Sequence, residues 1–137
     1  MRAESFVDTN VVLYAVSSDP SEAAKARRAR RILGTEEFGL STQVLQEFFV
    51  NATRKIAAPL TDEAALEFIE ILSTAAVVVV DVDLVVHAIG FKQQFQLSYW
   101  DAAIVAAAHA LGAEVLYTED LNHGQRYGSV RAENPFL

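Results

Sequence analysis

Four carboxylates are the residues of this sequence whose type and placement could do chemistry. They are Asp8, Glu47, Asp101 and Asp120. The 137-residue chain has no Cys, and its three His share no ligand-like spacing, so carboxylate oxygens are the metal ligands it offers. Hard oxygen ligands select Mg²⁺ or Mn²⁺, and such an ion keeps water that can attack a bound phosphate. The set therefore indicates phosphodiester hydrolysis.

Each carboxylate also has a simpler explanation when it is taken alone. Asp8 can cap the helix that follows it, and Asp101 stands three residues after Ser98, which is a capping-box spacing. Glu47 shares a helical face with other polar residues, and Asp120 lies in a polar loop. Their joint placement favours chemistry, because carboxylates crowded at one edge raise one another's pKa unless a cation neutralises them.

Short apolar runs and amphipathic segments alternate along the chain and predict the elements that position these acids. Strands are expected at residues 4–8, 38–40, 76–80, 114–117 and 129–131. Helices are expected from residue 11 and at 20–33, 42–56, 61–72, 84–95 and 98–111. Asp8 then ends the first strand, and Asp120 follows the fourth. Glu47 and Asp101 fall in the first two turns of their helices.

Strands separated by helices pair in parallel through right-handed crossovers, which predicts a three-layer α/β/α sandwich. Residues 6–8 and the β-branched run at 77–80 are expected in the interior of the sheet. In an open α/β sheet the binding crevice lies at the carboxyl ends of the strands. All four carboxylates can therefore open onto the same edge.

Composition limits the classes of protein that this chain can belong to. Hydrophobic residues make up 52% and charged residues 21%, which is typical of one globular domain. The absence of Cys suits a reducing compartment, and no apolar run reaches the length of about 18 residues that a membrane span needs. A cytoplasmic protein is the expectation.

The charge is acidic overall but unevenly distributed. Eleven Lys and Arg stand against 18 Asp and Glu, for a net charge of -7, which argues against a passive nucleic-acid coat. Five of the eleven basic residues nevertheless fall between residues 25 and 31, and four of them are Arg27, Arg28, Arg30 and Arg31. These arginines could bind RNA phosphates, or they could form a solvated face or dock an acidic partner.

Several segments, in this order, resemble the PIN-domain family. They are residues 6–15 (FVDTNVVLYA), 46–48 (QEF), 98–108 (SYWDAAIVAAA) and 118–125 (TEDLNHGQ), with a closing NPF at 134–136. Within that family the chain is most similar to the compact VapC-like toxin ribonucleases of type II toxin–antitoxin systems. The resemblance covers essentially the whole chain and implies a single PIN-like domain over residues 1–137.

The resemblance implies a Mg²⁺- or Mn²⁺-dependent endoribonuclease with about five parallel strands in the order 3-2-1-4-5. The four carboxylates would surround the metal, with Asp8 and Asp101 as its best-placed ligands and Glu119 able to trade roles with Asp120. Supporting polar groups would come from Thr9, Asn10, Thr118 and Asn122. An RNA substrate, a cognate antitoxin and a homodimer are the partners implied.

Other readings compete with this one. A receiver-like phospho-acceptor domain with Asp81 as its acceptor would need an acidic pair after the first strand and a late Lys, and the chain has neither. An aspartate-nucleophile phosphohydrolase would need an acid where Asn10 stands. A catalytically silent PIN-like module that binds protein or RNA remains open.

Aromatic residues at helical spacing could stack on bases, although that spacing favours packing in the core or in a dimer. These residues are Phe48, Phe49, Phe91, Phe95 and Trp100.

Overall fold

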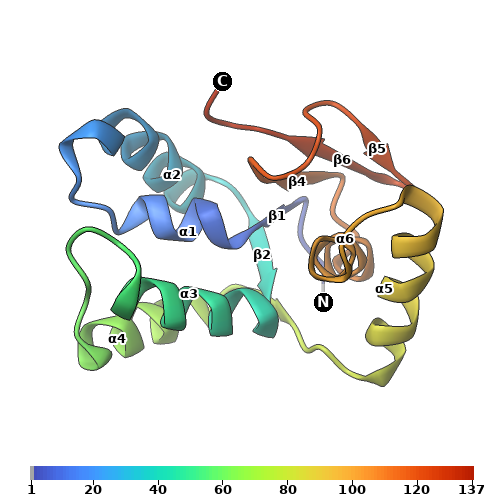
Figure 1. Ribbon diagram of the computed structural model, residues 1–137, viewed down its shortest axis with the longest axis horizontal. Helices are drawn as coiled ribbons and strands as arrows, with labels where there is room; N and C mark the ends of the chain where they lie inside the picture. The colour runs from blue at the N-terminus through green and yellow to red at the C-terminus, as the bar shows by residue number, and fades with distance from the viewer. Residues whose placement is uncertain (1) are drawn as a thin grey trace.

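A mixed β-sheet crosses the middle of the protein, with α1 to α4 on one side and α5 and α6 on the other (Figure 1). The computed structural model describes residues 2–137. The strands are β1 (Ser5–Val7), β2 (Phe38–Ser41), β3 (Ala76–Val78), β4 (Val115–Tyr117), β5 (Arg126–Tyr127) and β6 (Val130–Glu133). The helices are α1 (Thr9–Ala15), α2 (Ala23–Thr35), α3 (Thr42–Arg54), α4 (Asp62–Leu72), α5 (Val82–Phe95) and α6 (Tyr99–Leu111), and a 3₁₀ turn at Pro20–Glu22 precedes α2.

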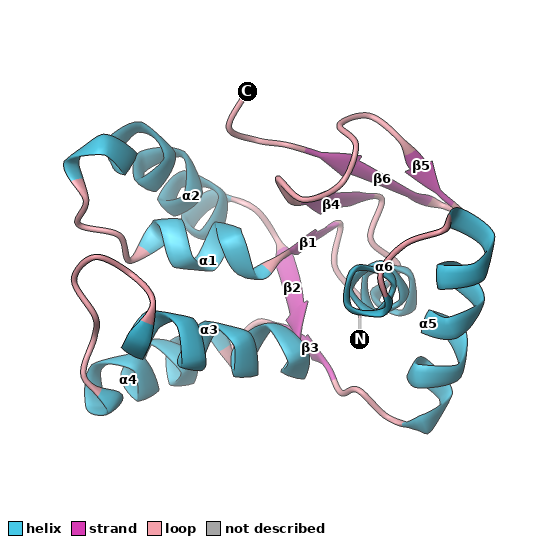
Figure 2. Cartoon of the chain, viewed as in Figure 1, coloured by secondary structure: helices cyan, strands magenta, loops and turns pink. Residues whose placement is uncertain are grey.

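The strand order in the described chain is β3-β2-β1-β4-β6-β5. All neighbours pair in parallel except β5 and β6, which form an antiparallel hairpin. The predicted α/β architecture and the order of its five parallel strands are confirmed, with β6 in the fifth place. The additional strand β5 is only two residues long, which is too short for an alternating pattern to reveal (Figure 2).

The interior position expected for residues 6–8 is confirmed, because β1 lies between β2 and β4. The same expectation for residues 77–80 is wrong. Strand β3 is at the edge of the sheet and ends at Val78, and Val79 is 65% exposed. A β-branched run fits an edge strand as well as a central one, so the composition of this run could not decide its place.

Helix α6 lies at the centre of the core. Seven consecutive residues, from 102 to 108, are buried, and the helix contacts β1, β2, β3, β4 and β6. Gly39 in β2 allows this close approach, since a Cβ there would clash with Leu111 and lie 2.8 Å from the carbonyl oxygen of Ala76. The packing of α6 holds the first turn of that helix, with Asp101, in a fixed place beside the sheet.

Polar caps begin the helices where the sequence places them. The side chains of Ser41, Thr61, Asp81 and Ser98 each accept a hydrogen bond from a backbone N–H three residues later. Asp81 is thus an exposed cap of α5. Among the described residues, no helix is long and apolar enough to cross a membrane.

Candidate active site

A cleft of about 220 Å³ opens at the carboxyl edge of the sheet, and we call it the acidic cleft. It is lined by residues that follow β1, β2 and β4 and by the first turns of α6. They are Asp8, Thr9, Asn10, Leu13, Gln43, Glu47, Asn51, Trp100, Asp101, Ile104 and Asp120. All four carboxylates singled out from the sequence line this cleft, and the described lining includes no Lys, Arg or His.

Asp8 is the most enclosed of the four carboxylates, at 5% exposure. Its Oδ1 accepts a hydrogen bond from the backbone N–H of Thr9 at 2.7 Å, and its Oδ2 accepts one from the Thr118 hydroxyl at 2.8 Å. Its own N–H donates to the carbonyl oxygen of Tyr117 at 3.0 Å, which extends the β1–β4 pairing by one residue. Asp8 therefore caps α1 and faces the cleft at the same time.

The surroundings of Asp8 disfavour its ionised form. Burial raises the pKa of its carboxyl from 3.8 to about 7, and the charges of Asp120 and Glu47 act in the same direction. The hydrogen bonds from Thr118 and Thr9 lower that pKa but do not offset the burial. Near neutral pH this carboxyl is thus poised to exchange its proton for a bound cation.

Asp101 begins α6 on the other wall of the cleft. Its backbone N–H donates to the Ser98 hydroxyl at 3.1 Å, so the capping geometry expected from the sequence is present. Partial burial raises the pKa of the Asp101 carboxyl, and the charges of Asp120 and Glu47 raise it further. Both Asp8 and Asp101 therefore lie within reach of the same two acidic neighbours.

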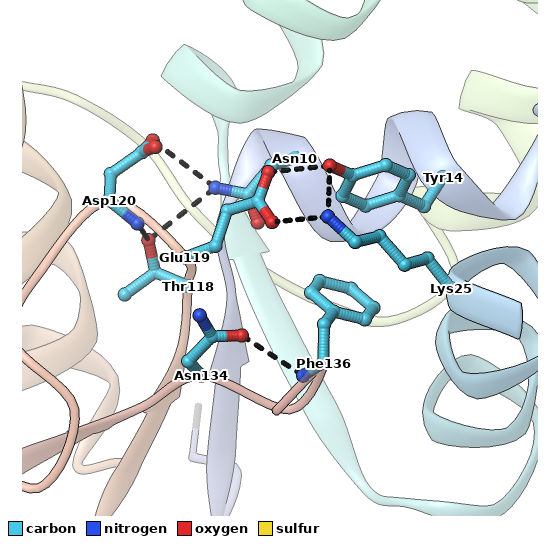
Figure 3. A network of polar contacts seen from close by, with 8 residues as sticks. All are labelled: Asn10, Tyr14, Lys25, Thr118, Glu119, Asp120, Asn134 and Phe136. Atoms are coloured by element: carbon cyan, nitrogen blue, oxygen red, sulfur yellow. Dashed lines mark hydrogen bonds and ion pairs between the residues drawn. The ribbon is translucent and has the colours of Figure 1, made fainter. Parts of the chain in front are cut away.

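Hydroxyl and amide groups hold the other two carboxylates. The Thr9 hydroxyl donates to Glu47 Oε1 at 2.7 Å. Asp120 Oδ2 accepts from Asn10 Nδ2 at 3.2 Å, and the Asp120 N–H donates to the Thr118 hydroxyl oxygen at 3.1 Å (Figure 3). Thr118 thus connects Asp120 to Asp8, and three of the four predicted supporting residues act on the carboxylates.

Three observations bear on whether this site fits a divalent cation. Among residues 2–137, no three Asp, Glu, His or Cys side chains are gathered tightly enough to hold an ion as they stand. The donors are all hard oxygens, and Asn10 Oδ1, on the cleft wall, is buried without a hydrogen-bond partner in the described chain. The donor chemistry fits Mg²⁺ or Mn²⁺, with the carboxylates spread around the cleft.

Asn122 and Glu119 do not join the site. The Asn122 amide is exposed and donates to Gln125 Oε1 at 2.8 Å, away from the cleft lining. Glu119 accepts from the Tyr14 hydroxyl at 2.6 Å and pairs with Lys25 Nζ at 3.3 Å. Asp120, rather than Glu119, therefore faces the cleft.

Tyr14 and Lys25 form a support that sequence reasoning missed. Lys25 Nζ lies 4.9 Å from the centre of the Tyr14 ring, and that ring meets Phe136 edge-on at 4.8 Å (Figure 3). With Glu119, these contacts tie α1 and α2 to the loop that carries Asp120. The one signal in the sequence is that Tyr14 stands one helical turn after Asn10.

The arginines of α2 do not line the cleft either. Arg28 Nε donates to the carbonyl oxygen of Pro135 at 3.3 Å, and Arg30 Nε donates to that of Ala15 at 2.8 Å. These two side chains fasten neighbouring segments to α2, and only Arg28 of the four arginines is partly buried, since Arg27, Arg30 and Arg31 are exposed.

Comparison with known proteins agrees with the fold. The model of the PIN domain matches residues 5–128, which is most of the chain. The chain belongs to the PIN domain family. PIN domains are generally nucleases. The comparison with curated protein sequences found no match.

Solved toxin–antitoxin structures share this PIN fold. A toxin–antitoxin complex from Klebsiella pneumoniae matches with a TM-score of 0.71 and 20% identity, over 96% of this chain and 97% of that one. VapC20 of Mycobacterium tuberculosis, a sarcin-ricin loop cleaving toxin, matches with a TM-score of 0.67 and 24% identity, over 85% of this chain and 89% of that one. DNA-bound VapBC from Salmonella typhimurium matches with a TM-score of 0.67 and 22% identity, over 97% of this chain and 98% of that one. The fold is therefore that of VapC-like PIN toxins.

Proposed function

We propose that this PIN domain is a Mg²⁺- or Mn²⁺-dependent endoribonuclease that acts as the toxin of a toxin–antitoxin pair. The observation that carries the proposal is the meeting of Asp8, Glu47, Asp101 and Asp120 in one cleft from four separate parts of the chain. In a chain of net charge -7, four carboxylates gathered at one edge of the sheet repel one another, and a bound cation would offset this repulsion.

In this proposal Asp8 and Asp101 hold the metal. Bound Mg²⁺ or Mn²⁺ would supply positive charge to the scissile phosphate and lower the pKa of water. Glu47 or Asp120 would orient the attacking water by accepting its hydrogen bond, or would hold a second ion. In this mechanism no residue of the chain forms a covalent bond to the RNA, so the protein contributes geometry and charge.

The polar neighbours keep these carboxylates in place. Thr118 and the N–H of Thr9 fix both oxygens of Asp8, so its orientation does not depend on the ligand. The Thr9 hydroxyl does the same for Glu47. Such prior orientation is what a site needs if its charges are to stabilise a transition state without reorganising.

A cleavage assay on structured RNA tests the proposed activity. Wild type with Mg²⁺ or Mn²⁺ should cleave, EDTA should abolish cleavage, and added Mn²⁺ should restore it. Asp8→Asn should lower the rate by orders of magnitude, since it removes a ligand charge at nearly constant size. Asp62→Asn, which neutralises an exposed carboxylate on α4, is the matched control and should cleave like wild type. Equal rates for wild type and Asp8→Asn would leave the silent binding module as the function.

The proposed partners are a cognate antitoxin and a second copy of the chain. The structural neighbours include toxin–antitoxin complexes, which supports an antitoxin. Co-expression with the product of the adjacent open reading frame should yield a stable complex with reduced cleavage. Sedimentation that shows only monomer at micromolar concentration would exclude the homodimer.

A further inference from the structure

Trp100 lies on the rim of the acidic cleft with most of its surface in water. It is 64% exposed, although it stands in the first turn of the most buried helix of the fold. The core packing that its helical spacing favoured is therefore wrong for this residue, whereas Phe48, from the same set of aromatics, is fully buried. Trp100 is also the only tryptophan in the sequence.

Contacts around Trp100 fix its position without covering its ring. Its carbonyl oxygen accepts a hydrogen bond from Nε2 of the buried Gln43 at 3.3 Å. The ring of Tyr99 meets the indole edge-on, with centroids 5.1 Å apart and planes at 78°, and Tyr99 packs against the core. The backbone of Trp100 is thus anchored at the cleft mouth, and its indole has one aromatic neighbour before any ligand arrives, which lowers the entropy cost of binding.

The charge of the cleft shows what such a ring could recognise. Its described lining has four carboxylates and no basic side chain, so a polyanion gains nothing there from Lys or Arg. Arg28 and Arg30 are committed to backbone carbonyls of the protein. Stacking between an aromatic ring and a nucleobase is insensitive to the negative charge of the site and tolerates any base.

We infer that Trp100 stacks on an unpaired nucleobase of RNA beside the phosphate at the acidic cleft. This inference rests on the proposed ribonuclease function and narrows its substrate to RNA with an unpaired nucleotide at the site of cleavage. In a duplex, both faces of a base are covered by its neighbours, so an indole can stack only on a base that is unstacked.

Fluorescence of the single tryptophan tests the contact directly. Asp8→Asn protein, which should leave RNA uncut, is titrated with a short single-stranded RNA of mixed sequence, with an abasic RNA of the same length, and with the perfect duplex. Excitation is at a wavelength that tyrosine does not absorb. The single strand should quench the emission, and the abasic and duplex RNAs should leave it nearly unchanged. Anisotropy of labelled RNA measures binding separately, and binding of the single strand without quenching would overturn the inference.

Steady-state kinetics provide the second readout. Trp100→Ala should raise KM about tenfold or more while kcat changes less, because stacking is made in the ground state and the transition state alike. Trp100→Phe should recover most of the loss. Leu66→Ala, an exposed apolar residue on α4, is the matched control and should leave KM unchanged.

Three outcomes separate this inference from its alternatives. If Trp100→Ala dissociates a dimer in sedimentation while RNA affinity and KM stay constant, Trp100 belongs to an interface between copies and the stacking inference fails. Quenching of Asp8→Asn by single-stranded RNA, together with a wild-type protein that cuts no RNA, would refute the proposed nuclease and support the stacking contact. Cleavage of RNA by Trp100→Ala with an unchanged KM would support the proposed nuclease and refute the stacking contact.

Discussion

The two ends of the parallel strands carry opposite kinds of cavity. At the carboxyl ends is the acidic cleft of about 220 Å³. At the amino ends of β2 and β3 is a larger hollow of about 720 Å³, which we call the amino-edge hollow. Its walls include Leu33, Phe38, Phe68, Ile71, Leu72 and Ala76. The larger cavity has mainly apolar walls with Arg2, Arg30, Glu36 and Glu37 among them, and the smaller one holds the four candidate carboxylates.

The charged groups that line the two cavities differ in sign, because the amino-edge hollow has both basic and acidic side chains and the acidic cleft has only acidic ones. Around the amino-edge hollow, Arg30 donates to Ala15, and the Glu36 carboxylate accepts from the Tyr117 hydroxyl at 2.8 Å. In the acidic cleft, by contrast, burial and neighbouring carboxylates raise the pKa of both Asp8 and Asp101. The proposed site is therefore distinguished by carboxylates that no basic side chain of its lining compensates, and it is the smaller of the two cavities.

The largest effect is expected when one residue of each cavity is substituted and the two rates of RNA cleavage are compared. Asp101→Asn should lower RNA cleavage by orders of magnitude, because it removes a proposed metal-ligand charge from the acidic cleft. Ile71→Ala, in the amino-edge hollow, should leave the rate within about twofold. Thermal melts of both variants check that each is folded. A comparable loss of cleavage in folded Ile71→Ala would show that the amino-edge hollow also takes part in the reaction.

The uncompensated charge should also be measurable through stability. The folded pKa of Asp8 is about 7 and its ordinary value is 3.8, so between these values the folded state holds a proton that the unfolded state has released. Stability is therefore lost as pH rises from about 4 through about 7, by an amount on the order of 4 kcal/mol. Asp8→Asn should lack this loss and unfold at higher urea than wild type at about pH 8.

Metal provides the control for that measurement. At about pH 8, added Mg²⁺ or Mn²⁺ should raise the Tm of wild type and have little effect on Asp8→Asn, because a ligand stabilises the state that binds it. If the urea midpoints of the two proteins run parallel from about pH 4 to about pH 8, the pKa of Asp8 is not raised by burial as described.

A smaller effect is expected where the carboxylates are linked by a neutral group. Thr118→Val would remove the hydroxyl that donates to Asp8 and accepts from the N–H of Asp120. Both groups would lose a partner, which should cost about 1 to 3 kcal/mol of unfolding free energy and a smaller share of activity than Asp101→Asn. Thr118→Ser keeps the hydroxyl, and its activity should stay close to wild type. Identical activities of the Val and Ser variants would show that this link does not position the carboxylates.

Sequence reasoning succeeded where a local pattern fixes a residue's place in the fold. Asp8 follows a buried run and Asp101 follows a capping serine, so the neighbouring residues alone place both acids at the ends of a strand and a helix. It failed where the outcome depends on what the rest of the chain places alongside. Val79 is exposed where the chain leaves β3 at the edge of the sheet, and Asn122 turns to Gln125 within its own loop.

The arginines of α2 and Trp100 also show that helical spacing does not reveal which parts of the chain lie beside a residue. A helical wheel groups Arg28 with Arg30, but the carbonyl oxygens to which they donate, of Pro135 and Ala15, belong to different segments of the chain. Periodicity could not distinguish Trp100 from buried aromatics either, since exposure depends on which helix face the sheet covers.

The strands at the two sides of the sheet also bear on aggregation. An outermost strand exposes unpaired N–H and C=O groups along one side, to which a strand of another molecule can add. Here the outermost strands, β3 and β5, are three and two residues long, so each can template only a few intermolecular hydrogen bonds. Although this chain is half hydrophobic, its native state therefore offers little for a growing fibril to extend.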